Sequence, residues 1–191
     1  MKKMKHIATV CVLGLLAGAS PHLPAESDAT RGTGGSDVSA VARLKLRIVI
    51  PRFLYFRVGA VGSSVEAVAF EPATDSVGDG ISVAGTAGGS ATRVALRSNA
   101  GEITIVADND GGTGGLGSGG PISLSEITAR SDSAALQTPQ LTDSGGTTIK
   151  ATPTGGDITD RRAIWSYAYR NRNAVEPGTY SAEIVYTAVS P

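Results

Sequence analysis

Apolar and polar residues alternate with a period of two along most of the chain after residue 38. The clearest case is residues 43–50, RLKLRIVI, where the apolar row of a strand is followed by a proline. Alternation of this kind predicts a half-buried strand. Proline cannot donate a ladder hydrogen bond, so Pro51 predicts an interruption, after which FLYFRV resumes as a second short strand. We expect one long edge strand broken at Pro51, with its apolar row closing the core: Leu44, Leu46, Ile48 and Ile50.

The same period recurs in short segments that are separated by Gly, Pro, Asp and Ser, and no segment shows a long helical period. Short strands with such turn residues between them indicate an all-β sandwich or barrel, and we expect an antiparallel β-sandwich of the immunoglobulin-like kind. The further strands that we expect cover residues 64–70, 80–85, 92–98, 102–108, 121–128, 147–152, 163–169 and 179–189.

Aromatic residues are concentrated in the last two of these segments, at even spacing. Packing in the core and across strands is the usual role of aromatic residues in sheets. A terminal strand is secured only by pairing with its neighbours, so we expect the last strand to be central in its sheet. The residues expected in the core of the carboxyl-terminal strands are Trp165, Tyr167, Tyr180, Ile184 and Tyr186.

The amino terminus is basic, MKKMKH, and is followed by about a dozen apolar residues that end in small side chains. This pattern predicts a signal peptide over residues 1–19 that is cleaved before Ser20. A weaker cleavage site lies after Ala25. The apolar run is shorter than the ~20 residues that a membrane span needs. We therefore expect an exported protein of the periplasm or cell surface with no integral membrane span. Residues 20–37 are expected to form a flexible leader, and residues 38–191 the β-sandwich domain.

Removal of residues 1–19 changes the composition in ways that exclude several chemistries. The only cysteine, Cys11, is lost, and His22 is the one remaining histidine. Disulfide frameworks, thiol nucleophiles and Ser-His-Asp triads are thereby excluded, and a zinc site would need carboxylates almost alone. The remaining 14 basic and 17 acidic residues give no general signal for nucleic-acid binding. We assign no catalytic residue, no cofactor and no metal site.

The glycine-rich stretch of residues 108–120, DNDGGTGGLGSGG, superficially invites a nucleotide-binding interpretation. Phosphate loops need a helix directly after the glycines, whereas PISLSEIT alternates as a strand does. Clustered oxygen atoms at Asp108, Asn109 and Asp110 leave Ca²⁺ binding open, although Thr113 and Gly119 do not fit an EF-hand loop. A mobile hairpin loop is the favoured interpretation.

Five cationic residues near the first strand form a candidate interaction ridge for acidic glycans, anionic lipids or nucleic acid. A solvated sheet face and protection of an edge strand explain the same pattern and are favoured. A pair of carboxylates acting as a glycosidase is a weaker possibility, because any two of 17 acidic residues could lie close together. The ridge comprises Arg43, Lys45, Arg47, Arg52 and Arg57.

Residues 160–191 combine a Trp-x-Tyr-x-Tyr strand, a turn at Pro177 and Gly178, and a final strand that begins Gly-Thr-Tyr. This end of the chain resembles exported bacterial fimbrial-subunit-like surface β-sandwich proteins, and the resemblance implies a pilin-like form of the sandwich as the alternative to an immunoglobulin-like one. Residues 121–146 are similar to the middle of those proteins, and LRIVIPRFLYFRVG to their first block. The chain departs from the commonest pilins, which carry a disulfide.

The resemblance implies a non-enzymatic structural or adhesive subunit, and strand addition between subunits has a physical basis here. An incomplete sandwich leaves a groove that accepts an alternating strand from a neighbour. Residues 38–50, VSAVARLKLRIVI, could be that donor strand or the first strand of their own domain. Partner subunits and a periplasmic chaperone follow from the first possibility. A ligand-binding β-sandwich module is the alternative function.

Overall fold

The computed structural model describes residues 28–35, 37–62, 65–87, 91–109 and 114–191. The chain divides into two compact units, Met1–Val49 and Ile50–Pro191, and each is described by itself. Every strand that the structure describes lies in the second unit. No helix among the described residues has the length and apolar character needed to cross a membrane.

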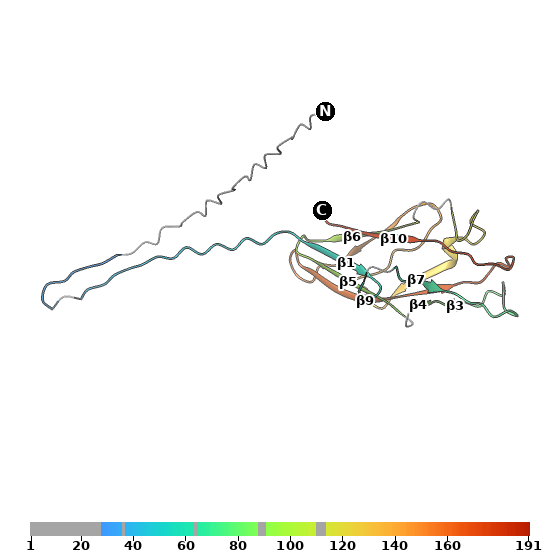
Figure 1. Cartoon of the computed structure of the whole chain (residues 1–191), viewed down its shortest axis with the longest axis horizontal. Coiled ribbons are helices and arrows are strands. Elements are labelled where there is room, and N and C mark those ends of the chain that lie inside the picture. Colours follow the sequence, from blue (N-terminus) through green and yellow to red (C-terminus); the bar gives the residue numbers. More distant parts are fainter. Residues whose placement is uncertain (1–27, 36, 63–64, 88–90, 110–113) are drawn as a thin grey trace, which may run out of the picture. The chain divides into compact units, whose positions relative to one another are not determined.

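The second unit is built from antiparallel sheets and is an all-β sandwich, as the alternation predicted. Figure 1 shows β6 and β10 in one layer and β1, β5 and β9 in the other. The larger sheet has the order β1-β5-β9-β3, with β7 also paired to β9, and the smaller has the order β10-β6-β8. The larger sheet contains β1 (Leu54–Val58), β3 (Val83–Ala84), β5 (Thr92–Ser98), β7 (Ile127–Ser131) and β9 (Thr159–Tyr169). The smaller contains β6 (Ile103–Asn109), β8 (Thr147–Ala151) and β10 (Ile184–Val189), and β2 (Val68–Ala69) pairs with β4 (Thr86–Ala87).

The core lies between the two layers and follows from the alternation of β5, β6 and β9. Trp165 is fully buried, and its indole Nε1 donates a 3.2 Å hydrogen bond to the carbonyl oxygen of Leu136. Its ring centroid lies 5.2 Å from that of Tyr186 on the opposite sheet. Fully burying a large apolar side chain contributes roughly 1.5–3 kcal/mol, so this row is a main source of stability.

Several expected strands have other bounds among the described residues: residues 64–70 contain only β2, residues 80–85 contain only β3, and β9 begins at Thr159 rather than 163. Residues 121–128 do not form one strand: Leu124–Glu126 is a 3₁₀ turn, and β7 begins only at Ile127. The Ser123 side chain accepts a hydrogen bond from the backbone N–H of Ser125 and so caps that turn. The last strand begins at Ile184 rather than 179, and before it the carbonyl oxygen of Ser181 accepts a hydrogen bond from the N–H of Gly117.

The expectation that residues 43–50 form a strand is wrong. Residues 44–50 belong to no strand, and the structure leaves their apolar side chains in solvent. Alternation puts residues on a common face, but a strand also requires hydrogen-bonding partners on a neighbouring chain segment. The exposed fractions are 82% for Leu44, 81% for Leu46, 85% for Ile48 and 76% for Ile50.

The expectation that the last strand is central is also wrong. Among the described residues β10 pairs with β6 alone and lies at an edge of its sheet. A single antiparallel ladder, running from Ile184 opposite Asn109 to Val189 opposite Thr104, is sufficient to hold it. One side of the last strand therefore remains available for pairing.

Candidate functional site

Two edge strands, one from each layer, border the same part of the core. β1 pairs only with β5 and β10 only with β6 among the described residues. A 2.9 Å hydrogen bond from the Arg52 guanidinium to the carbonyl oxygen of Pro191 joins the segments that flank these strands. The start of β1 and the end of β10 therefore lie close together, each with an unpaired edge.

The apolar side chains of these two strands cover the core only in part. Phe56 and Val58 of β1, with Tyr186 and Ala188 of β10, pack against the buried cluster around Trp165. All four are half-buried, whereas Leu96 and Ile105 in the adjacent inner strands are fully buried. The core is thus less completely covered at β1 and β10 than at the strands next to them.

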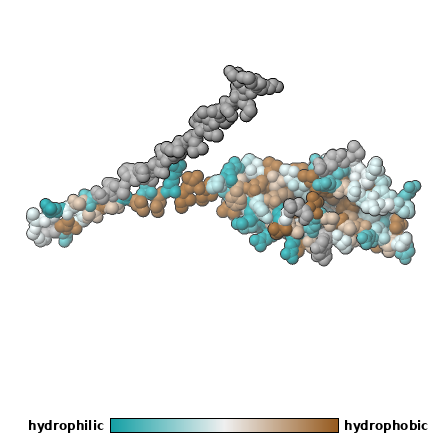
Figure 2. All heavy atoms as spheres, in the orientation of Figure 1, coloured by the Kyte–Doolittle hydropathy of each residue, from teal (hydrophilic) through white to brown (hydrophobic). Residues whose placement is uncertain are grey.

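The segment before β1 has the complementary character. Every second residue from Val38 to Ile50 is apolar, and the described structure leaves this row exposed. Figure 2 shows hydrophobic atoms on the surface of the segment that leads into β1. Contiguous exposed apolar rows are rare on monomeric proteins and mark sites of interaction. The segment is therefore a candidate surface for interaction with an apolar partner.

Asn99 binds the backbone of the residues just before β1. Its side-chain amide donates to the carbonyl oxygen of Pro51 and accepts from the N–H of Phe53, both at 2.8 Å. The Ser98 hydroxyl also donates to the Phe53 carbonyl oxygen, at 3.0 Å. These hydrogen bonds fix the backbone of residues 51–53 beside the end of β5.

The candidate cationic ridge divides between the two units. Arg43, Lys45 and Arg47 lie exposed in the first unit, and Arg52 and Arg57 lie in the second. Arg52 is engaged with the Pro191 carbonyl oxygen, and Arg57 projects from the outer face of β1. Three of the five residues therefore belong to the first unit and two to the second.

The expected aromatic core residues reach different depths. Trp165 is fully buried, while Tyr167, Tyr180, Ile184 and Tyr186 are half-buried. The Tyr167 and Tyr186 hydroxyl oxygens lie 3.1 Å apart and link the two sheets. Burial raises the pKa of both hydroxyls, so both stay protonated near neutral pH.

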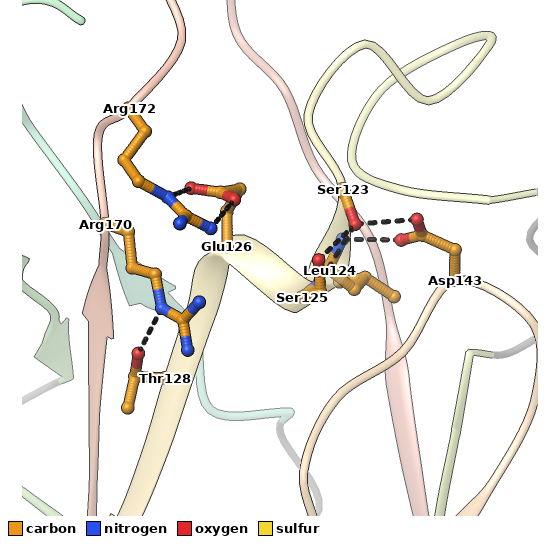
Figure 3. Close-up of polar contacts among 8 residues, drawn as sticks. All are labelled: Ser123, Leu124, Ser125, Glu126, Thr128, Asp143, Arg170 and Arg172. Atoms are coloured by element: carbon orange, nitrogen blue, oxygen red, sulfur yellow. Dashed lines mark hydrogen bonds and ion pairs between the residues drawn. The ribbon is translucent and has the colours of Figure 1, made fainter. Parts of the chain in front are cut away.

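A polar cluster that the alternation did not reveal surrounds the 3₁₀ turn, and Figure 3 shows its members. The Asp143 carboxylate accepts hydrogen bonds from the Ser123 hydroxyl at 2.7 Å and the Leu124 N–H at 2.6 Å. It also accepts from the N–H of Gly115 at 3.1 Å. The Ser123 hydrogen bond is the main reason that the pKa of Asp143 lies below its usual value. This carboxylate therefore joins the connection between β7 and β8 to two places in the connection between β6 and the 3₁₀ turn.

On the other side of the turn, Glu126 is buried and forms a two-pronged pair with Arg172 (Figure 3). The arginine Nη2–Oε1 distance is 2.5 Å and the Nε–Oε2 distance 3.1 Å. This hydrogen bonding lowers the pKa of Glu126 despite its burial. Arg170 beside it donates to the Thr128 hydroxyl at 3.1 Å. The Ser-x-x-Glu spacing of residues 123–126 is a capping pattern that could have revealed this turn.

These carboxylates are suited to holding the fold and poorly suited to donating protons. A general acid needs a pKa raised towards the working pH, whereas both pKa values here are lowered. The described residues include no group of three or more His, Cys, Asp or Glu side chains placed to hold a metal ion. Asp108 accepts from the N–H of Asn109, while Asp110, the other carboxylate of the considered Ca²⁺ site, lies outside the described residues.

No family model matches the chain, and no curated protein matches it.

Proposed function

We propose that this protein is an exported, non-enzymatic structural or adhesive subunit of a fimbria-like bacterial surface assembly, joined to its neighbours by strand addition. The observation that carries the proposal is the exposed apolar row of residues 38–50 in a chain whose own core is incompletely covered between β1 and β10. One subunit supplies the row, and the next supplies the open edges. Each removes apolar surface of the other from water.

The dimensions of donor and acceptor agree. Thirteen residues in extended conformation span about 40 Å, and the six residues of β10 span about 20 Å. The donor is therefore long enough to pair along the whole of β10 and still reach its own domain. Its apolar row would lie against Phe56 and Tyr186, and its backbone would complete the unpaired edges.

The backbone just before β1 is fixed to the second unit by the Asn99 side chain, which binds the Phe53 N–H and the Pro51 carbonyl oxygen. The opposite row of the donor carries Arg43, Lys45 and Arg47, which stay in solvent and discourage indiscriminate pairing. Before assembly, a periplasmic chaperone would shield the open edges.

The polar clusters support the non-enzymatic part of the proposal. Asp143 and Glu126 are engaged by loop N–H groups and by Arg172, and their lowered pKa values keep them ionised. They are anchors rather than proton donors. The resemblance of residues 160–191 to fimbrial-subunit-like proteins points in the same direction.

Neighbouring residues on opposite faces of the donor provide a matched test. Ile48→Asp places a charge in the apolar row, and Val49→Asp places it in the other row; both side chains are exposed, at 85% and 72%. We expect the wild-type protein and Val49→Asp to form oligomers and Ile48→Asp to remain monomeric, by size-exclusion chromatography with light scattering. Equal thermal midpoints for the monomers would show that the domain itself is intact.

Two results would contradict the proposal. One is a wild-type protein that remains a compact monomer at high concentration and does not incorporate a peptide of residues 38–50. The other is loss of oligomers to the same extent in both variants, since that would tie assembly to charge alone and not to the apolar row.

A further inference from the structure

The outer face of the larger sheet carries four arginines around one small residue, Ala95 in the middle of β5. The antiparallel registers place Arg57 of β1 and Arg162 of β9 directly beside Ala95, one on each side. Along β5 itself, Arg93 and Arg97 lie two residues before and two residues after it. We call this arrangement the arginine cross.

All four side chains share a face because the side-chain period of a strand is two. Val94 and Leu96, between them on β5, point into the core and are 2% and 0% exposed. Strands lie about 4.8 Å apart and rise about 3.3 Å per residue, so the cross spans about 10 Å across the sheet and about 13 Å along it. The small side chain of Ala95 leaves a hollow at its centre, and this hollow belongs to an open groove of about 850 Å³.

The fold leaves much of this positive charge without a counterion. Arg97 pairs with Asp160 at 3.4 Å, and Asp132, which also lines the groove, accepts from the N–H of Ile164. Within the described residues, Arg57, Arg93 and Arg162 take part in no salt bridge, and the buried Nε of Arg57 has no acceptor. A buried donor without an acceptor is destabilising and is rare in folded proteins. Like charges on one face repel, and a bound anion relieves that repulsion.

We propose that the arginine cross binds an acidic polysaccharide, with its carboxylate or sulfate groups seated on Arg57, Arg93 and Arg162 around Ala95. Guanidinium groups form paired hydrogen bonds with the planar or tetrahedral oxygens of such anions. Phe53 and Tyr55, each 47% exposed, line the same groove and offer apolar ring surface beside the charges. The cross is larger than one free anion requires, so an extended polymer with repeated charges fits it better.

The size and charge of the surface favour a glycan over nucleic acid. Proteins that bind duplex DNA commonly neutralise about six to ten phosphates from a strongly basic surface. The cross has four arginines, and Asp132 and Asp160 lie on the same face of a chain with 17 basic and 17 acidic residues. A compact site of this kind suits a chain whose charges are spaced by sugar rings.

This site is independent of the proposed strand addition. On β1, Tyr55 and Arg57 point outward, while Phe56 and Val58 point to the core that the donor strand would cover. A glycan on the cross therefore leaves the edges free, and an assembly would present the cross many times. Repeated presentation on one polymer raises apparent affinity without new contacts.

The test compares two double variants with the same change in net charge. Arg93→Gln with Arg162→Gln removes half of the cross, and Arg31→Gln with Lys150→Gln removes two exposed cations elsewhere. Binding of the full chain to immobilised heparin, to polygalacturonate and to neutral dextran is measured over a series of NaCl concentrations. We expect wild-type protein to bind the two acidic polymers more weakly as salt rises, because screening shortens the range of the attraction.

In the cross variant we expect apparent affinity to fall by at least about ten-fold, and in the charge-matched control to change by less than about two-fold. The proposal is overturned if wild-type protein does not bind either acidic polymer at low salt, or if both double variants bind alike. Duplex DNA that binds as tightly as heparin at equal salt would also overturn it, because attraction to any polyanion would then suffice. Unchanged thermal midpoints and oligomeric state of the cross variant separate a loss of binding from misfolding or failed assembly.

Discussion

Residues 43–50 and β9 have the same alternation of apolar and other side chains, yet the structure treats them in opposite ways. In β9 the inward row includes Ala163, Trp165 and Tyr169, all buried, because β9 is paired into the larger sheet and this face of the sheet packs against the smaller sheet. In residues 44–50 the apolar row is more than three-quarters exposed, and no strand forms. Alternation therefore shows which residues share a face. Burial depends on whether neighbouring strands exist to cover it.

The largest effect on stability is expected when the largest buried side chain of β9 is removed. Trp165→Ala should lower the free energy of unfolding by ~3–5 kcal/mol, because it leaves a cavity in the core and removes the contact with Tyr186. Denaturant unfolding of the purified protein measures this change. Ile164→Ala, the adjacent residue on the outer face and 42% exposed, is the control and should cost much less. Equal losses for both would mean that Trp165 is not a core residue.

A smaller effect on stability is expected when the pairing of the buried Glu126 with Arg172 is weakened. Glu126→Gln should cost about 1–3 kcal/mol at neutral pH, because the charged hydrogen bonds to Arg172 are weakened. Glu126 has a folded pKa below its unfolded value near 4.5, so its stabilisation is present above that value. It is lost as pH falls through the lower, folded pKa.

Unfolding free energy measured from neutral pH into the acid range checks this sign. The wild-type curve should fall as the solution becomes acidic, and Glu126→Gln should flatten part of that fall. Glu102→Gln, which affects the exposed pair with Lys150, should leave the curve nearly unchanged. A wild-type protein that gains stability on acidification would contradict the assignment for Glu126 and for Asp143.

The smallest change in stability is expected for a substitution in residues 43–50, which pair with no strand that the structure describes. Leu46→Ala should alter the thermal midpoint of the monomer by an amount near the experimental error, because the side chain is 81% exposed and loses almost no contacts. The same variant should weaken oligomers measurably, since each apolar side chain of the row would be buried only in the assembly. Destabilisation of the monomer by several degrees would show instead that residues 43–50 complete their own domain.

The sequence by itself determined the secondary-structure class and much of the strand positions. Residues 92–98 and 102–108 were expected as strands and are β5 (Thr92–Ser98) and β6 (Ile103–Asn109), because period two and turn residues are local properties of the chain. Trp165 lies in the core for the same local reason, as an aromatic residue on the inward row of a strand. Features that depend only on residues close together in the sequence, such as strand positions, could therefore be predicted from the sequence.

Only the tertiary structure decided which edges have partners and which side chains from distant strands meet. The open edge of β10 and the Asn99 hydrogen bonds to residues 51–53 each depend on contacts between segments far apart in the chain. The arginine cross depends on the registers of β1, β5 and β9, which bring Arg57 and Arg162 to either side of Ala95. A shift of one residue in either register would turn the neighbouring arginine to the core face, and alternation within a single strand does not specify that register.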